Sequence, residues 1–226
     1  MMTMACVRAA SVALCMALPS GALASTLVNG DFNDDSSFLP GWTLAPGSSI
    51  GAQTCTISVV GCAPGGDGWH AVLSLDGTAN AGISQEVAIN GPAILRFGAI
   101  VSFGTIHPTG NPARGDITLS DLDGGPSASV GRTVGDLAGQ YTIQGLLGYS
   151  FTPWFDLVGA LRLDGTGPRS VLFNIHTSGA APDSTIIFIA ENAFLTVHPI
   201  PLPPALPLLL GGLLALRQVG RSPRRS

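Results

Sequence analysis

The sequence predicts an all-β protein built as a two-sheet sandwich, and two observations favour this fold class. Charged residues make up only 11% of the chain and glycine contributes 30 residues, a composition that suits short strands and tight turns better than helices with charged wet faces. Runs rich in β-branched residues recur at spacings of roughly 10–20 residues, with Gly, Pro, Asn or Asp in the gaps. This spacing of predicted strands favours a sandwich over a βαβ fold, which needs helical crossovers.

Residues 1–24 are expected to form a cleaved secretory signal peptide. Arg8 precedes an apolar stretch at residues 9–18, a helix-breaking Pro-Ser-Gly follows, and the small-residue site ends at Ala24, so that Ser25 becomes the new N-terminus. The alternative is a short membrane anchor, but the apolar stretch is well below the ~20 residues that a span needs.

The domain itself is expected to occupy residues 25–197. Alternation and β-branched content predict strands in eight places, with no helix before residue 204: 70–75, 83–89, 94–103, 117–122, 141–147, 157–163, 171–176 and 186–197.

Three blocks of sequence resemble known jelly-roll proteins. Residues 26–32 followed by Gly41 and Trp42 resemble the Asn-Gly-Asp-Phe-Glu opening of galactose-binding-like jelly rolls, which include many carbohydrate-binding modules. Residues 74–87 and 188–196 are similar to an internal segment and to the closing strand of exported jelly rolls. The resemblance therefore implies that the sandwich is a jelly roll, a fold that hosts many unrelated functions.

The same resemblance implies a structural calcium ion as the one candidate cofactor. Related jelly rolls often hold calcium between an early acidic residue and an acidic residue of the closing strand. Here the candidate ligands are Asp31, Asn33, which stands where the family has Glu, and Glu191, which stands where the family has Asp.

The chain contains a short internal repeat: residues 73–78 and 161–166 match at five of six positions around Asp-Gly. Paired calcium or sugar loops are one interpretation. Hairpin turns are the favoured one, since Asp and Gly both tolerate positive φ.

Two cysteines remain once the signal peptide has removed Cys6 and Cys15. Cys55 and Cys62 are predicted to form a disulfide, because an even number of cysteines in an exported chain is typical of disulfide bonding. A metal site is the alternative, but it needs further soft ligands and only His70 is near in sequence.

Charge and motif content exclude several kinds of chemistry. Lysine is absent, and residues 25–199 carry five arginines against all 14 acidic residues, a net charge of −9; nucleic acid is therefore not an expected partner. Residues 47–51 fit Gly-x-Ser-x-Gly but lack the strand-to-helix context of a nucleophile. The histidines show no metal spacing, and no two carboxylates stand out as a glycosidase pair.

Carbohydrate binding is the function that remains. Sugar rings stack on exposed aromatic planes, so Trp42, Trp69 and Trp154 are the candidate platforms. Trp69, in a Gly-rich turn, is the best of the three.

The C-terminal segment, residues 198–226, has three parts: a proline-rich lead, an apolar run over residues 205–216 and a basic end with Arg217, Arg221, Arg224 and Arg225. A membrane helix is expected to begin at Pro203 or Pro204 and to run at most to Gly220, with the arginines in the cytoplasm.

This segment resembles the PEP-CTERM sorting tail, in the variant that reads Val-Pro-Leu-Pro-Ala. The matching residues are Ile200, Pro201, Leu202, Pro203 and, after one extra proline, Ala205. The resemblance implies transient anchoring in the inner membrane, cutting by an exosortase-type enzyme, and release to the cell surface or extracellular matrix. A permanent single-pass anchor is the alternative.

The sequence therefore predicts an exported, non-enzymatic protein of the cell surface or exopolysaccharide matrix that packs within or binds polysaccharide. The alternative from another class is a secreted hydrolase of matrix polysaccharide.

Overall fold

The structure is a computed structural model that describes residues 27–33, 39–45, 49–54, 60–64, 69–76, 81–179 and 185–200. The predicted signal peptide with its cleavage site, Cys55 and the tail from Pro201 onward lie outside these residues. No helix in the described ranges is long and apolar enough to cross a bilayer.

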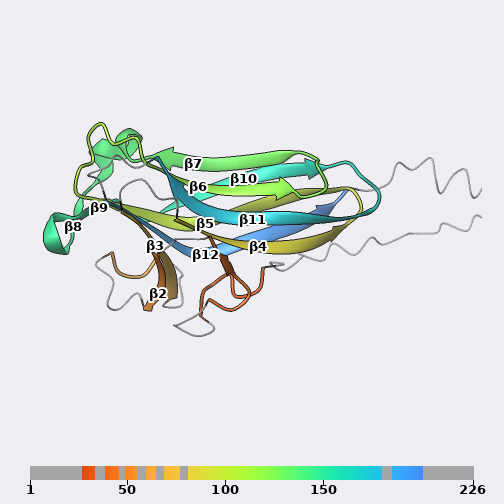
Figure 1. The fold of residues 1–226 in the computed structure, drawn as a ribbon, viewed down its shortest axis with the longest axis horizontal. Coiled ribbons are helices and arrows are strands. Elements are labelled where there is room, and N and C mark those ends of the chain that lie inside the picture. The colour runs from red at the N-terminus through yellow and green to blue at the C-terminus, as the bar shows by residue number, and fades with distance from the viewer. Residues whose placement is uncertain are drawn as a thin grey trace, which may run out of the picture.

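The described residues form an all-β sandwich of two antiparallel sheets, as predicted (Figure 1). The five-stranded sheet has the order β1-β4-β11-β6-β7, with bounds Thr43–Leu44, Ala81–Asn90, Pro168–Ser178, Arg114–Asp121 and Ser127–Thr133. The seven-stranded sheet has the order β2-β3-β12-β5-β9-β8, with β10 also paired to β5. Its bounds are Ser49–Thr54, Trp69–Asp76, Thr185–Pro199, Ala93–Thr105, Ser150–Phe151, Ile143–Gln144 and, for β10, Phe155–Leu163.

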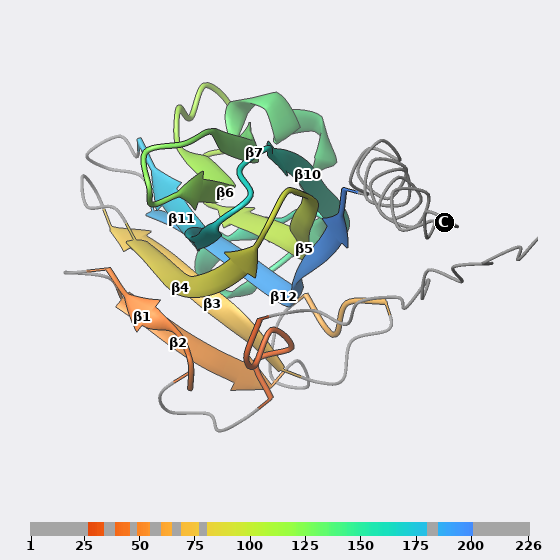
Figure 2. The same cartoon turned by 90° about the vertical axis from the view of Figure 1, so that its right-hand side faces the viewer.

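The hydrophobic core lies between the two sheets (Figure 2). Strand β11 alternates cleanly, with Val171, Phe173 and Ile175 buried while the residues between them are partly exposed. Phe97 of β5 meets Phe173 edge to face, with ring centroids 6.4 Å apart. Alternation with period two thus places one face of each sheet in the core and leaves the other face for solvent or ligand.

Seven of the eight predicted strands are confirmed, with bounds that differ by a few residues at their ends. The prediction for residues 141–147 is wrong: the two-residue strand β8 there lies between two 3₁₀ helices, Gly135–Gln140 and Leu146–Gly148. Leu147 has φ of 56° and is 90% exposed, so the apolar pattern here did not reflect burial. Strands β1, β2, β7 and β9 were not predicted. In β7, an edge strand, Val130 is the one large apolar residue, so its alternation gives a weak signal.

The Asp-Gly pairs of the two matching segments lie at strand ends, but the hairpin turns favoured for them are not found among the described residues. The strands that follow, β4 and β11, belong to the other sheet, and neither Asp164 nor Gly165 has a positive φ. Strand β3 ends at Asp76, and β10 ends at Leu163, directly before Asp164. The Asp164 carboxylate accepts a hydrogen bond from Nε of Arg162 at 2.7 Å on the exposed surface.

Gln85 of β4 fixes the N-terminal turns to the five-stranded sheet. Its side-chain oxygen accepts a hydrogen bond from the Val28 N–H at 2.7 Å, and its Nε2 donates to the carbonyls of Val28 and Gly41 at 3.0 and 2.8 Å. Trp42 completes the attachment, because its Nε1 donates to the Asn29 carbonyl at 3.0 Å and its ring packs on Phe32. Two of the sequence blocks that resemble jelly rolls therefore meet at one buried amide.

Candidate functional site

The candidate site forms where the first turn of the domain meets an irregularity in β12. The pairing of β12 with β5 shifts register between Glu191 and Phe194, and Asn192 has φ of 51°. The Ala193 N–H donates to the Gly30 carbonyl at 2.7 Å. A Cβ at residue 30 would lie 2.3 Å from the Ala193 carbonyl oxygen, so this close approach requires glycine.

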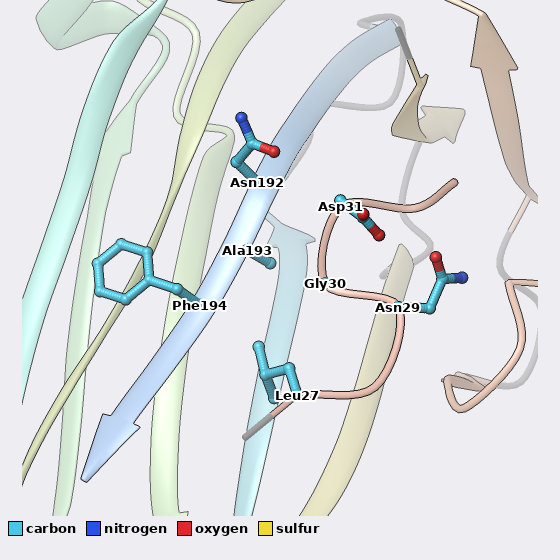
Figure 3. A pocket seen from close by; sticks show the side chains of 7 residues that line it. All are labelled: Leu27, Asn29, Gly30, Asp31, Asn192, Ala193 and Phe194. Carbon is cyan, nitrogen blue, oxygen red and sulfur yellow. The ribbon is translucent and has the colours of Figure 1, made fainter. Parts of the chain in front are cut away.

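An open hollow of about 450 Å³ lies between the turn and β12 (Figure 3). Asn29, Gly30 and Asp31 line it from the turn, and Asn192, Ala193 and Phe194 line it from the strand, with Leu27 at one end. The side chains of Asp31, Asn192 and Phe194 are partly exposed, whereas Leu27, Asn29 and Ala193 are buried. The partly exposed lining of the hollow therefore includes one carboxylate and one amide, and Phe194 borders the hollow from β12.

Phe194 extends from β12 to the side away from the turn (Figure 3). It lies opposite Gly98 of β5, and its Cε1 is 3.1 Å from the position of a Cβ at residue 98. The ring thus occupies the space that a side chain at residue 98 would need. Val158 of β10, 42% exposed, lies on the other side of Gly98 in the same cross-strand row.

The two halves of the outer face of the seven-stranded sheet differ in their covering. One half carries a second hydrophobic cluster, in which Val60, Phe151 and Ile189 are buried against partly buried neighbours. The other half carries Phe194, Arg96 and Val158, in rows that the strand register places side by side. We call this second half, with Ile94, Ala160 and Thr196, the outer platform.

The three predicted tryptophan platforms are placed differently by the structure. Trp42 is only 7% exposed and contacts Phe32 and Phe173, so it is a core residue, contrary to the prediction. Trp154 is partly buried in the second cluster, and its Nε1 donates to the Val60 carbonyl at 3.3 Å. Trp69 begins β3, but its side chain lies outside the described part, so its role stays a prediction.

The predicted calcium ligands lie in two different elements, the first turn and β12. Asp31 and Asn33 share the first turn, where the Asn33 N–H donates to Asp31 Oδ1 at 3.5 Å. Glu191 is fully buried, and its Oε2 accepts a hydrogen bond from the Ala63 N–H at 3.0 Å. No group of three acidic, His or Cys residues within the described ranges could hold a metal ion. Calcium binding, with Asn33 as one of its predicted ligands, stays a prediction.

The Cys55–Cys62 bridge stays a prediction as a pairing. Cys62 is exposed and disulfide-bonded, whereas Cys55 lies outside the described residues.

A polar cluster lies on the outer face of the five-stranded sheet. Arg114 Nε is 2.7 Å from both carboxylate oxygens of Asp116, and Ser129 Oγ donates to the same carboxylate at 3.3 Å. His176 lies opposite Asp116, with its Nδ1 3.3 Å from Asn174 Nδ2. Burial lowers the pKa of His176, while Asp116 raises it and Arg114 lowers it. These groups bond chiefly to one another, so we favour the hollow and the outer platform as the site.

Sequence reasoning missed Asn192 and Phe194 as site residues. The buried positions of β12 change phase across the bulge, from Ile186, Phe188 and Ala190 to Ala193 and Leu195. This change of phase cannot be recognised in the sequence, because residues 187 and 189 are also apolar. They pack on the second hydrophobic cluster, on the face of β12 opposite the core.

The fold and the hollow define a β-sandwich with a surface site, and comparison with known proteins adds distant likenesses. No protein-family model matches the sequence, and no curated protein matches it. The chain is similar to TmCBM61, solved in complex with β-1,4-galactotriose: 16% identity, TM-score 0.46, covering 76% of this chain and 97% of that one.

Two further solved structures are similar at the same level. The CBM22-1 xylan-binding domain of Paenibacillus barcinonensis Xyn10C is 12% identical, with a TM-score of 0.40, covering 79% of this chain and 94% of that one. The enzymatically active domain of bacteriophage CBA120 tailspike protein 4 is 13% identical, with a TM-score of 0.43. That match covers 77% of this chain but only 21% of the tailspike chain.

Proposed function

We propose that this chain is an exported, non-enzymatic carbohydrate-binding protein of the cell surface or exopolysaccharide matrix. The observation that carries the proposal is a partly exposed aromatic ring, Phe194, beside a hollow that presents Asp31 and Asn192. A sugar offers an apolar ring face and a rim of hydroxyl groups. An aromatic side chain complements the first, and carboxylate and amide groups complement the second.

Rigidity at this site supports a binding role. The Gly30 carbonyl bonds to Ala193, and Gln85 holds the adjoining residue Val28 to β4. A site whose walls are fixed before the ligand arrives loses little conformational entropy on binding.

The placement of the two glutamates favours binding over hydrolysis. Glu86 is exposed on β4 of the five-stranded sheet, whereas Glu191 is buried on β12 of the other sheet. They do not face one another across a single cleft, as the two carboxylates of a glycosidase must.

Export and sorting belong to the same proposal and rest on the sequence. The predicted signal peptide takes the chain across the inner membrane, and the tail holds it there until an exosortase-type enzyme cuts near residues 200–205. The folded domain then reaches the surface or the matrix, where polysaccharide is the ligand at hand.

Retention on immobilised polysaccharides tests the binding proposal. Phe194→Ala is expected to weaken retention about tenfold, the loss of one aromatic contact of about 1.4 kcal/mol. Leu122→Ala is the matched control, because it trims an exposed apolar residue directly after β6 of the five-stranded sheet, outside the hollow and the outer platform. Failure of the unchanged protein to bind any glycan would refute the proposal. Release of reducing ends from a labelled glycan would instead show that the protein is a polysaccharide hydrolase.

A further inference from the structure

The five arginines of the domain differ in how they are paired. Three form ion pairs: Arg114 with Asp116, Arg162 with Asp164, and Arg169 with Asp121. Among the described residues, Arg96 and Arg132 have no acidic partner within ion-pair distance. Arg132 lies in β7 of the five-stranded sheet, where its Nη1 donates to the neighbouring Gly131 carbonyl. Arg96 is exposed and lies on the outer platform, next to the proposed site.

Arg96 lies on the outer platform beside Phe194. Thr196 is opposite Arg96, and Phe194 is opposite Gly98 on the same two strands. Phe194 and Arg96 are therefore diagonal neighbours on one face, about 7–8 Å apart at the backbone. Ala160 flanks Arg96 on the β10 side and offers no charge.

Within the part of the chain that the structure describes, no acidic side chain lies within ion-pair distance of Arg96. Asp156 and Asp164 each lie four residues from Ala160, one on either side along the line of β10, about 13 Å at 3.3 Å per residue. Asp31 lies at the level of Ala193, three residues from Thr196, about 10 Å by the same measure. Both separations exceed the screening length of about 8 Å at physiological ionic strength.

An unpaired arginine is unexpected on so acidic a domain. Residues 25–199 carry a net charge of −9, so a general attraction for polyanions is absent and an anionic ligand needs a local reason to bind. Arg96 supplies that reason, because a guanidinium group matches the planar geometry of a carboxylate.

Resting on the proposed function, we infer that the site takes a carboxylate-bearing glycan, such as a polyuronate, rather than a neutral one. The sugar ring lies on Phe194, its hydroxyl groups meet Asp31 and Asn192 in the hollow, and its carboxylate pairs with Arg96. The Asp31 carboxylate repels any second carboxylate of the glycan at the hollow. The site therefore favours a glycan with one carboxylate directed at Arg96 over a glycan that is densely charged.

Binding of the full chain, kept in mild detergent, to alginate and to neutral galactan tests the inference. The unchanged protein is expected to prefer alginate, and Arg96→Gln to lose about fivefold in affinity for alginate, the upper range for one exposed ion pair, with galactan binding unchanged. Arg132→Gln removes the same charge from the other sheet and is expected to leave both affinities unchanged.

The outcomes separate this inference from the function beneath it. Equal binding of both glycans, unaffected by Arg96→Gln, overturns the carboxylate specificity and leaves carbohydrate binding in place. Equal losses in both arginine variants overturn it too, since they indicate general charge attraction. Absence of binding to either glycan, or to any other tested, overturns the proposed function itself.

Discussion

At the scale of single residues, Gln85 shows how one side chain can organise distant segments. It makes three hydrogen bonds to backbone groups of Val28 and Gly41 and is only 7% exposed. Gln85→Ala is expected to lower the free energy of unfolding by about 2–4 kcal/mol, since each such bond contributes about 0.5–1.5 kcal/mol. Urea denaturation measures the change, and Glu86→Ala at the exposed neighbouring position is the control; equal effects of the two changes would contradict the assigned role.

His176 gives a prediction about pH at the same scale. Its pKa in the folded protein is lowered, first by burial and then by the Arg114 charge, against the opposing effect of Asp116. Below about pH 6.5, the ordinary pKa of histidine, the unfolded chain therefore binds a proton at residue 176 more readily than the folded protein does. The free energy of unfolding is consequently highest above this pH and decreases as the pH falls below it.

The measurement is the midpoint of urea unfolding between about pH 7.5 and pH 5, around the ordinary histidine pKa. His176→Gln is expected to flatten the decline toward acid, whereas His107→Gln, at an exposed turn position, is expected to leave it unchanged. An unchanged slope in His176→Gln would show that other groups cause the decline.

At the scale of secondary-structure elements, the bulge in β12 and the first turn create the site together. Gly30→Ala is expected to push the turn away from the Ala193 carbonyl and to lower stability by about 2–3 kcal/mol, the upper part of the usual range for one substitution. Gly139→Ala is the matched control, because nothing lies within 4 Å of a Cβ there and its φ is not positive. Thermal unfolding of both variants tests the prediction, and a small effect of Gly30→Ala would mean that the turn moves freely.

At the scale of the whole molecule, the ends of the chain decide where the sandwich is used. Residue 200 still bonds to the domain, since its N–H donates to the Pro92 carbonyl at 3.0 Å, and the predicted sorting motif starts at this same residue. We therefore expect cleavage to leave the folded domain intact, with its last strand complete.

Cell fractionation checks this expectation, with one tag in the loop at Gly124, exposed on the surface, and another after Ser226. Release of only the first tag to the surface or matrix is the expected result. Both tags remaining together in the inner membrane would favour the permanent anchor instead.

Much of the fold followed from local pattern. Alternation over residues 83–89, 171–176 and 186–197 reflects the burial of one face of each strand, so these elements could be predicted without knowing their neighbours. The hairpin expected at Asp-Gly 164–165 was wrong, because β10 and β11 belong to different sheets and a local motif does not say which strands pair.

The sequence by itself determined the fold class, most of the strands and the blocks that carry the jelly-roll resemblance, because each depends on the order of neighbouring residues. Only the tertiary structure decided which aromatic ring lies at a surface site. Trp42 became core because β11 supplied Phe173 as a neighbour, and Phe194 reached the surface because the bulge turned it over Gly98 of another strand. Such contacts join residues about a hundred positions apart, and no local pattern encodes them.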